Sequence, residues 1–136
     1  MNQKFPKSEK LKSTKTIERL FKEGLVLTAY PFKVVCLPDT FEVKNFPVKA
    51  GVSVSKRNFK KAVDRNRIKR LMREAYRRNK YLIFNKISTP YAIMFLYLGK
   101  EIPTLDKTDQ YIIVLINRFL KELENKPDKK KADELI

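Results

Sequence analysis

The side chains best able to do chemistry in this sequence are cations, and they are concentrated in one segment. Residues 56–80 contain twelve lysines and arginines against two acids, Asp64 and Glu74. The first fifteen residues add five lysines and one glutamate, and the rest of the chain is close to neutral although the net charge is +16. Arginine binds phosphate oxygens through paired hydrogen bonds, and lysine binds them as a point charge. Charge gathered on one element with few interleaved acids is typical of a nucleic-acid site.

Several kinds of catalytic site are excluded by the composition. The chain has no histidine and one cysteine, which rules out a histidine base, an internal disulfide and a cysteine-based zinc site. No glycine-rich nucleotide-binding loop is present. A divalent-metal site needs clustered carboxylates, whereas the acids here are scattered: Asp39, Glu42, Asp64, Glu74, Glu101, Asp106 and Asp109. We therefore expect no catalytic residue and no metal bound by the protein alone.

The length of 136 residues, with 43% hydrophobic residues, fits a single domain. The basic N-terminus lacks the apolar run of a secretion signal, and the longest apolar stretch, residues 91–98, is too short to cross a bilayer. We therefore expect a cytoplasmic protein without membrane contact. Residues 1–126 form the predicted domain, with a basic and partly flexible arm at 1–13, and a flexible polar tail follows at 127–136.

Three helices are predicted, and the cationic segment is the second of them, at about residues 59–80. Its apolar residues recur at the spacing of one narrow helix face: Ile68, Leu71, Met72 and Ala75. The cations of the segment spread over the opposite side. The first helix begins at residue 13 or 14 and ends at 23, before Gly24, and the last runs from about 106 or 108 to 124. The second helix thus packs by one face and presents its cations on the other.

The strands are predicted at residues 32–37, 48–55 and 91–98. Residues 48–55 alternate between apolar and polar side chains, which indicates a half-buried strand. Residues 91–98 are continuously apolar, which indicates a strand buried on both faces. The order of helix, strands, helix, strand and helix indicates the α+β class, with a single-layer mixed β-sheet packed with helices. By the general rule, the strand–helix–strand unit around the cationic helix would cross over right-handed.

The exact string of the cationic helix resembles a known signature. AVDRNRIKRLMREAYR, at residues 62–77, resembles the motif of the bacterial ribonuclease P protein subunit, which has an Arg-Asn-Arg core, a basic pair, an apolar pair, Arg-Glu and an aromatic. VSVSKR at 52–57 looks like the family's strand leading into that helix. Residues 10–12 and 17–24 are similar to its N-terminal pattern, so the resemblance spans about residues 10–124.

This resemblance implies a ribonucleoprotein in which the RNA carries the chemistry. The RNA subunit uses Mg²⁺ to remove the 5′ leader of precursor tRNA endonucleolytically, and the protein, a monomer when alone, binds that RNA and the leader. DNA is not an expected partner. The implied fold has the order α-β-β-β-α-β-α, like the second domain of a small-subunit ribosomal protein. Its crossover around the cationic helix is left-handed, against the general rule.

The resemblance also assigns roles to residues. The motif matches at Arg65, Asn66, Arg67, Lys69, Arg70 and Arg73, and we extend this predicted RNA-binding surface with Lys56, Arg57, Lys60, Lys61 and Arg77. The leader cleft, between the sheet and the first helix, is predicted at Ile17, Phe21, Phe32, Val35, Ser53 and Ser55. Two of these positions depart from the family, because Ile17 stands where the family often has an aromatic and Val35 stands where some members have tyrosine. Phe59 likewise stands where many members have glycine.

Alternatives remain open for the function and for two kinds of residue. A structural ribosomal protein would share the basic α+β layout. A DNA-binding module is disfavoured because no helix-turn-helix pairing precedes the cationic helix. Phe21 is either core or cleft, and the two serines either line the cleft or are merely solvated.

Overall fold

The computed structural model describes residues 10–11, 13–38, 48–87 and 90–125. The predicted tail at 127–136, residues 39–47 and most of the predicted arm at 1–13 lie outside these residues. The elements follow one another in the order α1 (Thr14–Glu23), β1 (Leu25–Ala29), β2 (Phe32–Pro38), β3 (Val48–Val54), α2 (Ala62–Asn79), α3 (Tyr81–Phe84), β4 (Tyr91–Tyr97) and α4 (Leu105–Asn125). The α+β class and the predicted mixed sheet are confirmed.

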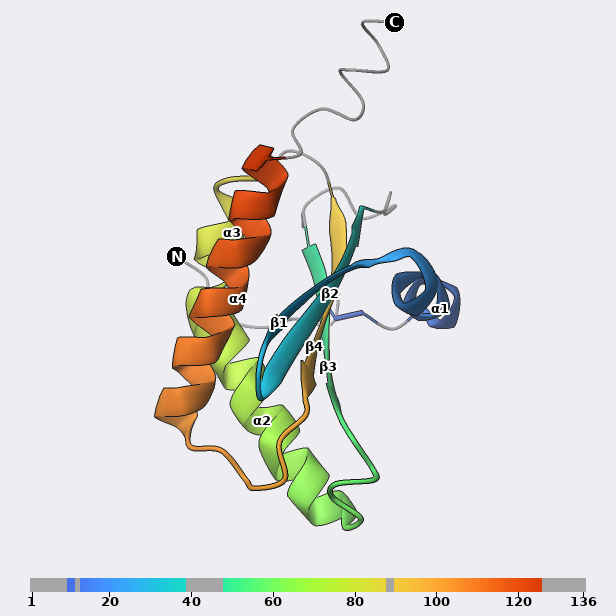
Figure 1. Ribbon diagram of the computed structural model, residues 1–136, viewed down its shortest axis with the longest axis vertical. Helices are drawn as coiled ribbons and strands as arrows, with labels where there is room; N and C mark the ends of the chain where they lie inside the picture. The colour runs from blue at the N-terminus through green and yellow to red at the C-terminus, as the bar shows by residue number, and fades with distance from the viewer. Residues whose placement is uncertain (1–9, 12, 39–47, 88–89, 126–136) are drawn as a thin grey trace, which may run out of the picture.

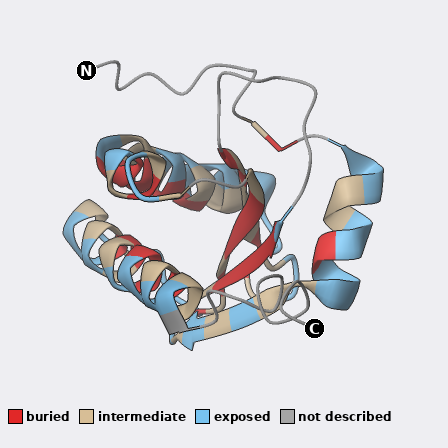
Figure 2. Ribbon diagram, turned by 90° about the horizontal axis from the view of Figure 1, so that it is seen from above, coloured by how far each residue is buried: buried red, intermediate tan, exposed pale blue. Residues whose placement is uncertain are grey.

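The four-stranded sheet has the order β1-β2-β4-β3. β4 pairs in parallel with β3 and antiparallel with β2, and β1 pairs antiparallel with β2. β4 takes an inner position because it is apolar on both faces, and β3 is left at the edge. The connection that leads from β3 through α2 to the parallel strand β4 is left-handed (Figures 1 and 2). The general right-handed rule thus fails here, and the expectation from the resemblance holds.

Helices cover both faces of the sheet (Figure 2). α2 and α4 pack on one face, where the larger cluster includes Val34, Ile93 and Phe95. α1 packs on the other face over a smaller cluster, which we call the α1-side cluster: Leu11, Leu20, Val35, Leu37, Ala92 and Met94. Side chains of β4 alternate between the two clusters, so the strand predicted to be buried on both faces is confirmed as such.

α1 begins and ends where the sequence predicts. The N–H of Thr16 donates to the Ser13 side-chain oxygen at 3.3 Å, which caps the first turn. Gly24 ends the helix with a φ of −67°, so the position does not need glycine for a left-handed backbone conformation. A Cβ at this position would clash with the Leu20 carbonyl oxygen and with Cγ1 of Val35. Glycine therefore lets the end of α1 lie directly against β2.

α2 begins at Ala62, later than the predicted start at residue 59. The Phe59 side chain is 7% exposed, and its ring lies 6.1 Å from that of Tyr97. The N–H of Phe59 donates to the Ser55 carbonyl at 3.1 Å. Residues 55–61 thus form a loop held against the end of β4, and the helix starts only after it.

Two elements have no residue range in the sequence-based prediction, although the order α-β-β-β-α-β-α implied by the resemblance already includes three strands before α2, as the structure has them. β1 is five residues long at the edge of the sheet, and none of its side chains is fully buried. α3 is a single helical turn of four residues directly after α2. Neither is long enough to display a period.

We expect the α1-side cluster to hold α1 in place through Leu20, which is fully buried. Leu20→Ala removes that contact and leaves a cavity, so the free energy of unfolding should fall by about 2–5 kcal/mol. Urea denaturation measures the loss, and Lys22→Ala, on the exposed side of the same helix, should change stability by less than about 0.5 kcal/mol. Equal effects of the two substitutions would contradict the assigned packing of α1.

Candidate nucleic-acid interface

α2 separates apolar from cationic side chains around its circumference. The side chains turned toward the core are buried: Ile68, Met72, Ala75, Tyr76 and Asn79. The predicted RNA-binding residues all lie outside this stripe, exposed or half-buried: Lys56, Arg57, Lys60, Lys61, Arg65, Asn66, Arg67, Lys69, Arg70, Arg73 and Arg77. The structure therefore brings these residues to one solvent-facing surface, and their contact with RNA stays a prediction.

The loop before α2 is fixed at both sides by side-chain hydrogen bonds. Asn58 donates from Nδ2 to the carbonyls of Leu98 and Gly99, at 3.1 and 3.3 Å. Arg65 donates from Nη1 to the carbonyls of Phe59 and Lys60, at 2.8 and 2.9 Å. Arg65 therefore has a second role that its motif position does not indicate. It holds the basic loop at the start of the cationic helix.

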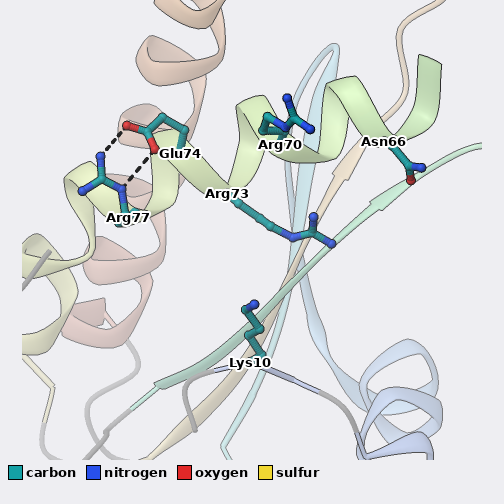
Figure 3. A pocket seen from close by; sticks show the side chains of 6 residues that line it. All are labelled: Lys10, Asn66, Arg70, Arg73, Glu74 and Arg77. Carbon is teal, nitrogen blue, oxygen red and sulfur yellow. Dashed lines mark hydrogen bonds and ion pairs between the residues drawn. The ribbon is translucent and has the colours of Figure 1, made fainter. Parts of the chain in front are cut away.

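A pocket of about 420 Å³ lies between α2 and the edge strand β3 (Figure 3). It is lined by Lys10, Asn66, Arg70, Arg73, Glu74 and Arg77. Lys10 was not among the predicted site residues, because a lysine in a basic N-terminal arm has no signal of its own. The structure shows that it pairs in parallel with Ala50 of β3. This pairing brings the N-terminal lysine opposite the motif helix.

Glu74 carries the carboxylate of this pocket, and its partner is Arg77. The Arg77 Nε donates to Oε2 of Glu74 at 3.0 Å, and a second short hydrogen bond joins Nη2 to Oε1. This hydrogen bonding, with the charges of Arg77 and Arg78, lowers the pKa of Glu74 despite some desolvation. The carboxylate is thus ionised at neutral pH and neutralised by Arg77, which leaves the pocket dominated by cations.

Of the residues predicted for a leader cleft, four lie on the α1 side of the sheet, and the three apolar ones among them differ in exposure. Val35 is 2% exposed and Ile17 is partly buried, and both pack in or against the α1-side cluster. Phe21, on the outer face of α1, is 53% exposed. Of these three, only Phe21 offers an open surface, so the core interpretation of this residue is wrong.

Phe32 does not lie with them. Because side chains alternate along β2, Phe32 faces α2 and α4, where it is fully buried. Its ring lies 4.8 Å from that of Tyr97 and 5.4 Å from that of Tyr111, measured between centroids. Phe32 is a core residue, and it cannot line a cleft beside α1.

Ser53 and Ser55 also differ in position, because Ser53 belongs to β3 and Ser55 follows its end. Ser53 is half-buried on the α1 side and pairs with Leu96 in register, which continues across the sheet to Lys33 and Thr28. We call these four residues the α1-side row. Ser55 lies in the loop, where its Oγ accepts from the Arg57 N–H at 3.1 Å. Only Ser53 therefore contributes to the sheet surface, and sequence alternation alone did not single out Lys33 and Thr28 beside it.

Two further findings concern the described residues alone. They contain no group of three or more histidine, cysteine, aspartate or glutamate side chains placed to hold a metal ion. None of the helices among them has the length and apolar character needed to cross a membrane.

Comparison with known proteins places the chain in a family. The family described as Ribonuclease P matches residues 5–126. The ribonuclease P protein component of Porphyromonas gingivalis is 37% identical over 116 residues, covering 81% of this chain and 84% of that protein. That of Chlorobaculum tepidum is 33% identical over 114 residues, covering 75% and 73%.

Solved structures agree in fold. The ribonuclease P protein of Thermotoga maritima superposes with a TM-score of 0.65 at 25% identity, covering 81% of this chain and 96% of that one. The protein of Staphylococcus aureus gives a TM-score of 0.64 at 23% identity, covering 82% and 94%. The comparisons give no support to a ribosomal protein. The family match over residues 5–126 and the similar relatives agree with the Arg-Asn-Arg helix and the sheet topology, and the chain belongs to the ribonuclease P protein family.

Proposed function

We propose that this protein binds the RNA subunit of ribonuclease P through α2 and the loop before it, while that RNA carries out the cleavage. The observation that carries the proposal is the solvent-facing array of cations on α2, opposite its buried stripe. Phosphates neutralised by such an array release counterions, which favours binding. We assign the Mg²⁺ of the reaction to the RNA, whose phosphate oxygens are ligands of the kind that this ion prefers.

We further propose that the 5′ leader of precursor tRNA lies on the α1 side of the sheet. Phe21 on α1 and Val26 on β1 are exposed, and the α1-side row adds one lysine and two hydroxyls to this side of the sheet. A single-stranded nucleic acid is bound by aromatic stacking and by cations that follow its backbone. Phe21 supplies the stacking surface, and Lys33 supplies the charge. Since Ile17 and Val35 are aliphatic and Val35 is buried, stacking depends on Phe21.

A reconstitution tests the function directly. The purified protein is mixed with the ribonuclease P RNA and a precursor tRNA bearing a 5′ leader, at a Mg²⁺ concentration too low for the RNA alone. We expect cleavage at the mature 5′ end only when protein and RNA are both present. Cleavage by the protein alone, or no stimulation of the RNA, would refute the proposed division of labour.

Arg67 is exposed in the centre of the motif, so its removal should delete a phosphate contact. For Arg67→Ala we expect weaker binding to the RNA subunit and a plot of log affinity against log salt that is flatter by about one unit. Filter binding across a salt series measures both quantities. Lys121→Ala, an exposed cation on α4, serves as the control and should leave the slope unchanged. A slope that Arg67→Ala does not alter would argue against phosphate contact at this position.

Phe21→Ala should weaken binding of leader-bearing precursor tRNA by about 1–3 kcal/mol, the range for loss of one stacked base. Mature tRNA, which has no leader, should bind the holoenzyme as before. Phe21→Tyr keeps the aromatic face and should retain most of the affinity. The measurement compares dissociation constants of the holoenzyme for the two RNAs, and an equal loss for both would exclude a leader contact at Phe21.

A further inference from the structure

The pocket between α2 and the N-terminal segment has a feature that the motif alone does not explain. Figure 3 shows Lys10 pointing from the β3 edge toward α2, and Arg73 pointing from α2 into the same space. These two side chains come from segments more than sixty residues apart in the sequence. Two cationic side chains that point into one open space can both contact the same anion.

We infer that Lys10 and Arg73 together bind one phosphate group of the RNA, and that Leu11 couples this contact to α1. The inference rests on the proposed function, because it names a contact within the same RNA-binding surface. It adds the N-terminal segment as a second wall of the site. It also connects that segment, through the packing of Leu11, to α1 on the opposite face of the sheet.

The N-terminal segment is held in a defined position beside β3. The N–H of Leu11 donates to the Ala50 carbonyl at 2.9 Å. The Leu11 side chain is 8% exposed and belongs to the α1-side cluster. It passes closely over Gly51, where an added Cβ would lie 3.5 Å from the Leu11 Cβ and 3.1 Å from Cε of Met94. Lys10 is therefore positioned by the fold, unlike a lysine on a free arm.

The charge and the size of the pocket both fit a nucleotide phosphate. Its lining has four cationic side chains and one carboxylate, and that carboxylate is already neutralised by Arg77. Its volume of about 420 Å³ falls in the usual range of small-ligand sites, about 300–1,000 Å³. The space thus admits one nucleotide unit of a strand running between α2 and the β3 edge. Asn66, at one end, can donate to or accept from a sugar hydroxyl.

The coupling follows from the order of two neighbouring residues. When a phosphate holds Lys10 near Arg73, it also holds Leu11 in the α1-side cluster. That cluster contains Leu20, through which α1 packs on the sheet. RNA binding on the α2 side should therefore stabilise the position of α1, the helix that carries Phe21. Sites that share an ordered element in this way are coupled, and the coupling acts in both directions.

A double-mutant cycle tests the shared phosphate. Affinities for the ribonuclease P RNA are measured for Lys10→Ala, Arg73→Ala and the double variant, with Lys10→Gln to separate charge from packing. If both residues bind one phosphate, the double variant loses less than the product of the single losses, by at least about threefold. Lys15→Ala, an exposed lysine that does not line the pocket, should combine with Arg73→Ala multiplicatively. Multiplicative losses for Lys10 and Arg73 would overturn the inference.

Hydrogen exchange tests the coupling to α1. Amides of α1 should exchange more slowly in the complex with the RNA subunit than in the free protein. Lys10→Ala should abolish this added protection, and Lys15→Ala should retain it. Protection that does not depend on Lys10 would overturn the link through Leu11. If Arg67→Ala weakens RNA binding but Lys10→Ala does not, only this inference fails, whereas no effect of either would refute the proposed function as well.

Discussion

The inner position of β4 is the constraint on which the rest of the structure depends. Its seven residues are almost continuously apolar, and a strand of that kind must be covered on both faces. α2 and α4 provide one cover, and α1 with Leu11 provides the other. Because the apolar stripe of α2 packs on this face of β4, the cations on the rest of the helix face solvent. The cationic surface of α2 is thus a consequence of how β4 is buried.

The high charge is tolerated because it lies at the surface in two neighbouring places. Arg70, Arg73 and Lys10 face a common open space, and the charge of Arg77 is compensated by Glu74. Repulsion within such an array is screened by salt in solution and removed by a polyanion. The face beside α1 has a different character, because the α1-side row contributes one lysine and two hydroxyls and Phe21 contributes an exposed aromatic ring. The protein therefore offers two chemically distinct surfaces, one on each side of the sheet.

Much of this arrangement is predictable from the sequence, because long elements carry clear periods. The apolar stripe of α2 follows from the spacing of residues such as Ile68 and Met72, and its cations from the motif. What escaped prediction depends on contacts between distant segments. Phe32 is aromatic in the right part of the chain, yet strand alternation turns it into the core. Lys10 gains its place only by pairing with Ala50. The start of α2 is set by the packing of Phe59 on Tyr97, and no pattern in the neighbouring sequence predicts this contact.

The fixed loop before α2 has a consequence for how RNA is discriminated. Asn58 and Arg65 bind it by side-chain hydrogen bonds at both sides, so the backbone that carries its lysines is ordered before RNA arrives. A preordered set of cations loses less conformational entropy on binding than a flexible tail does. It also has definite spacings, which suit only those RNAs whose phosphates have matching spacings. If RNA binds this loop as proposed, the rigidity of the loop turns a sequence-independent attraction into a selection for RNA shape.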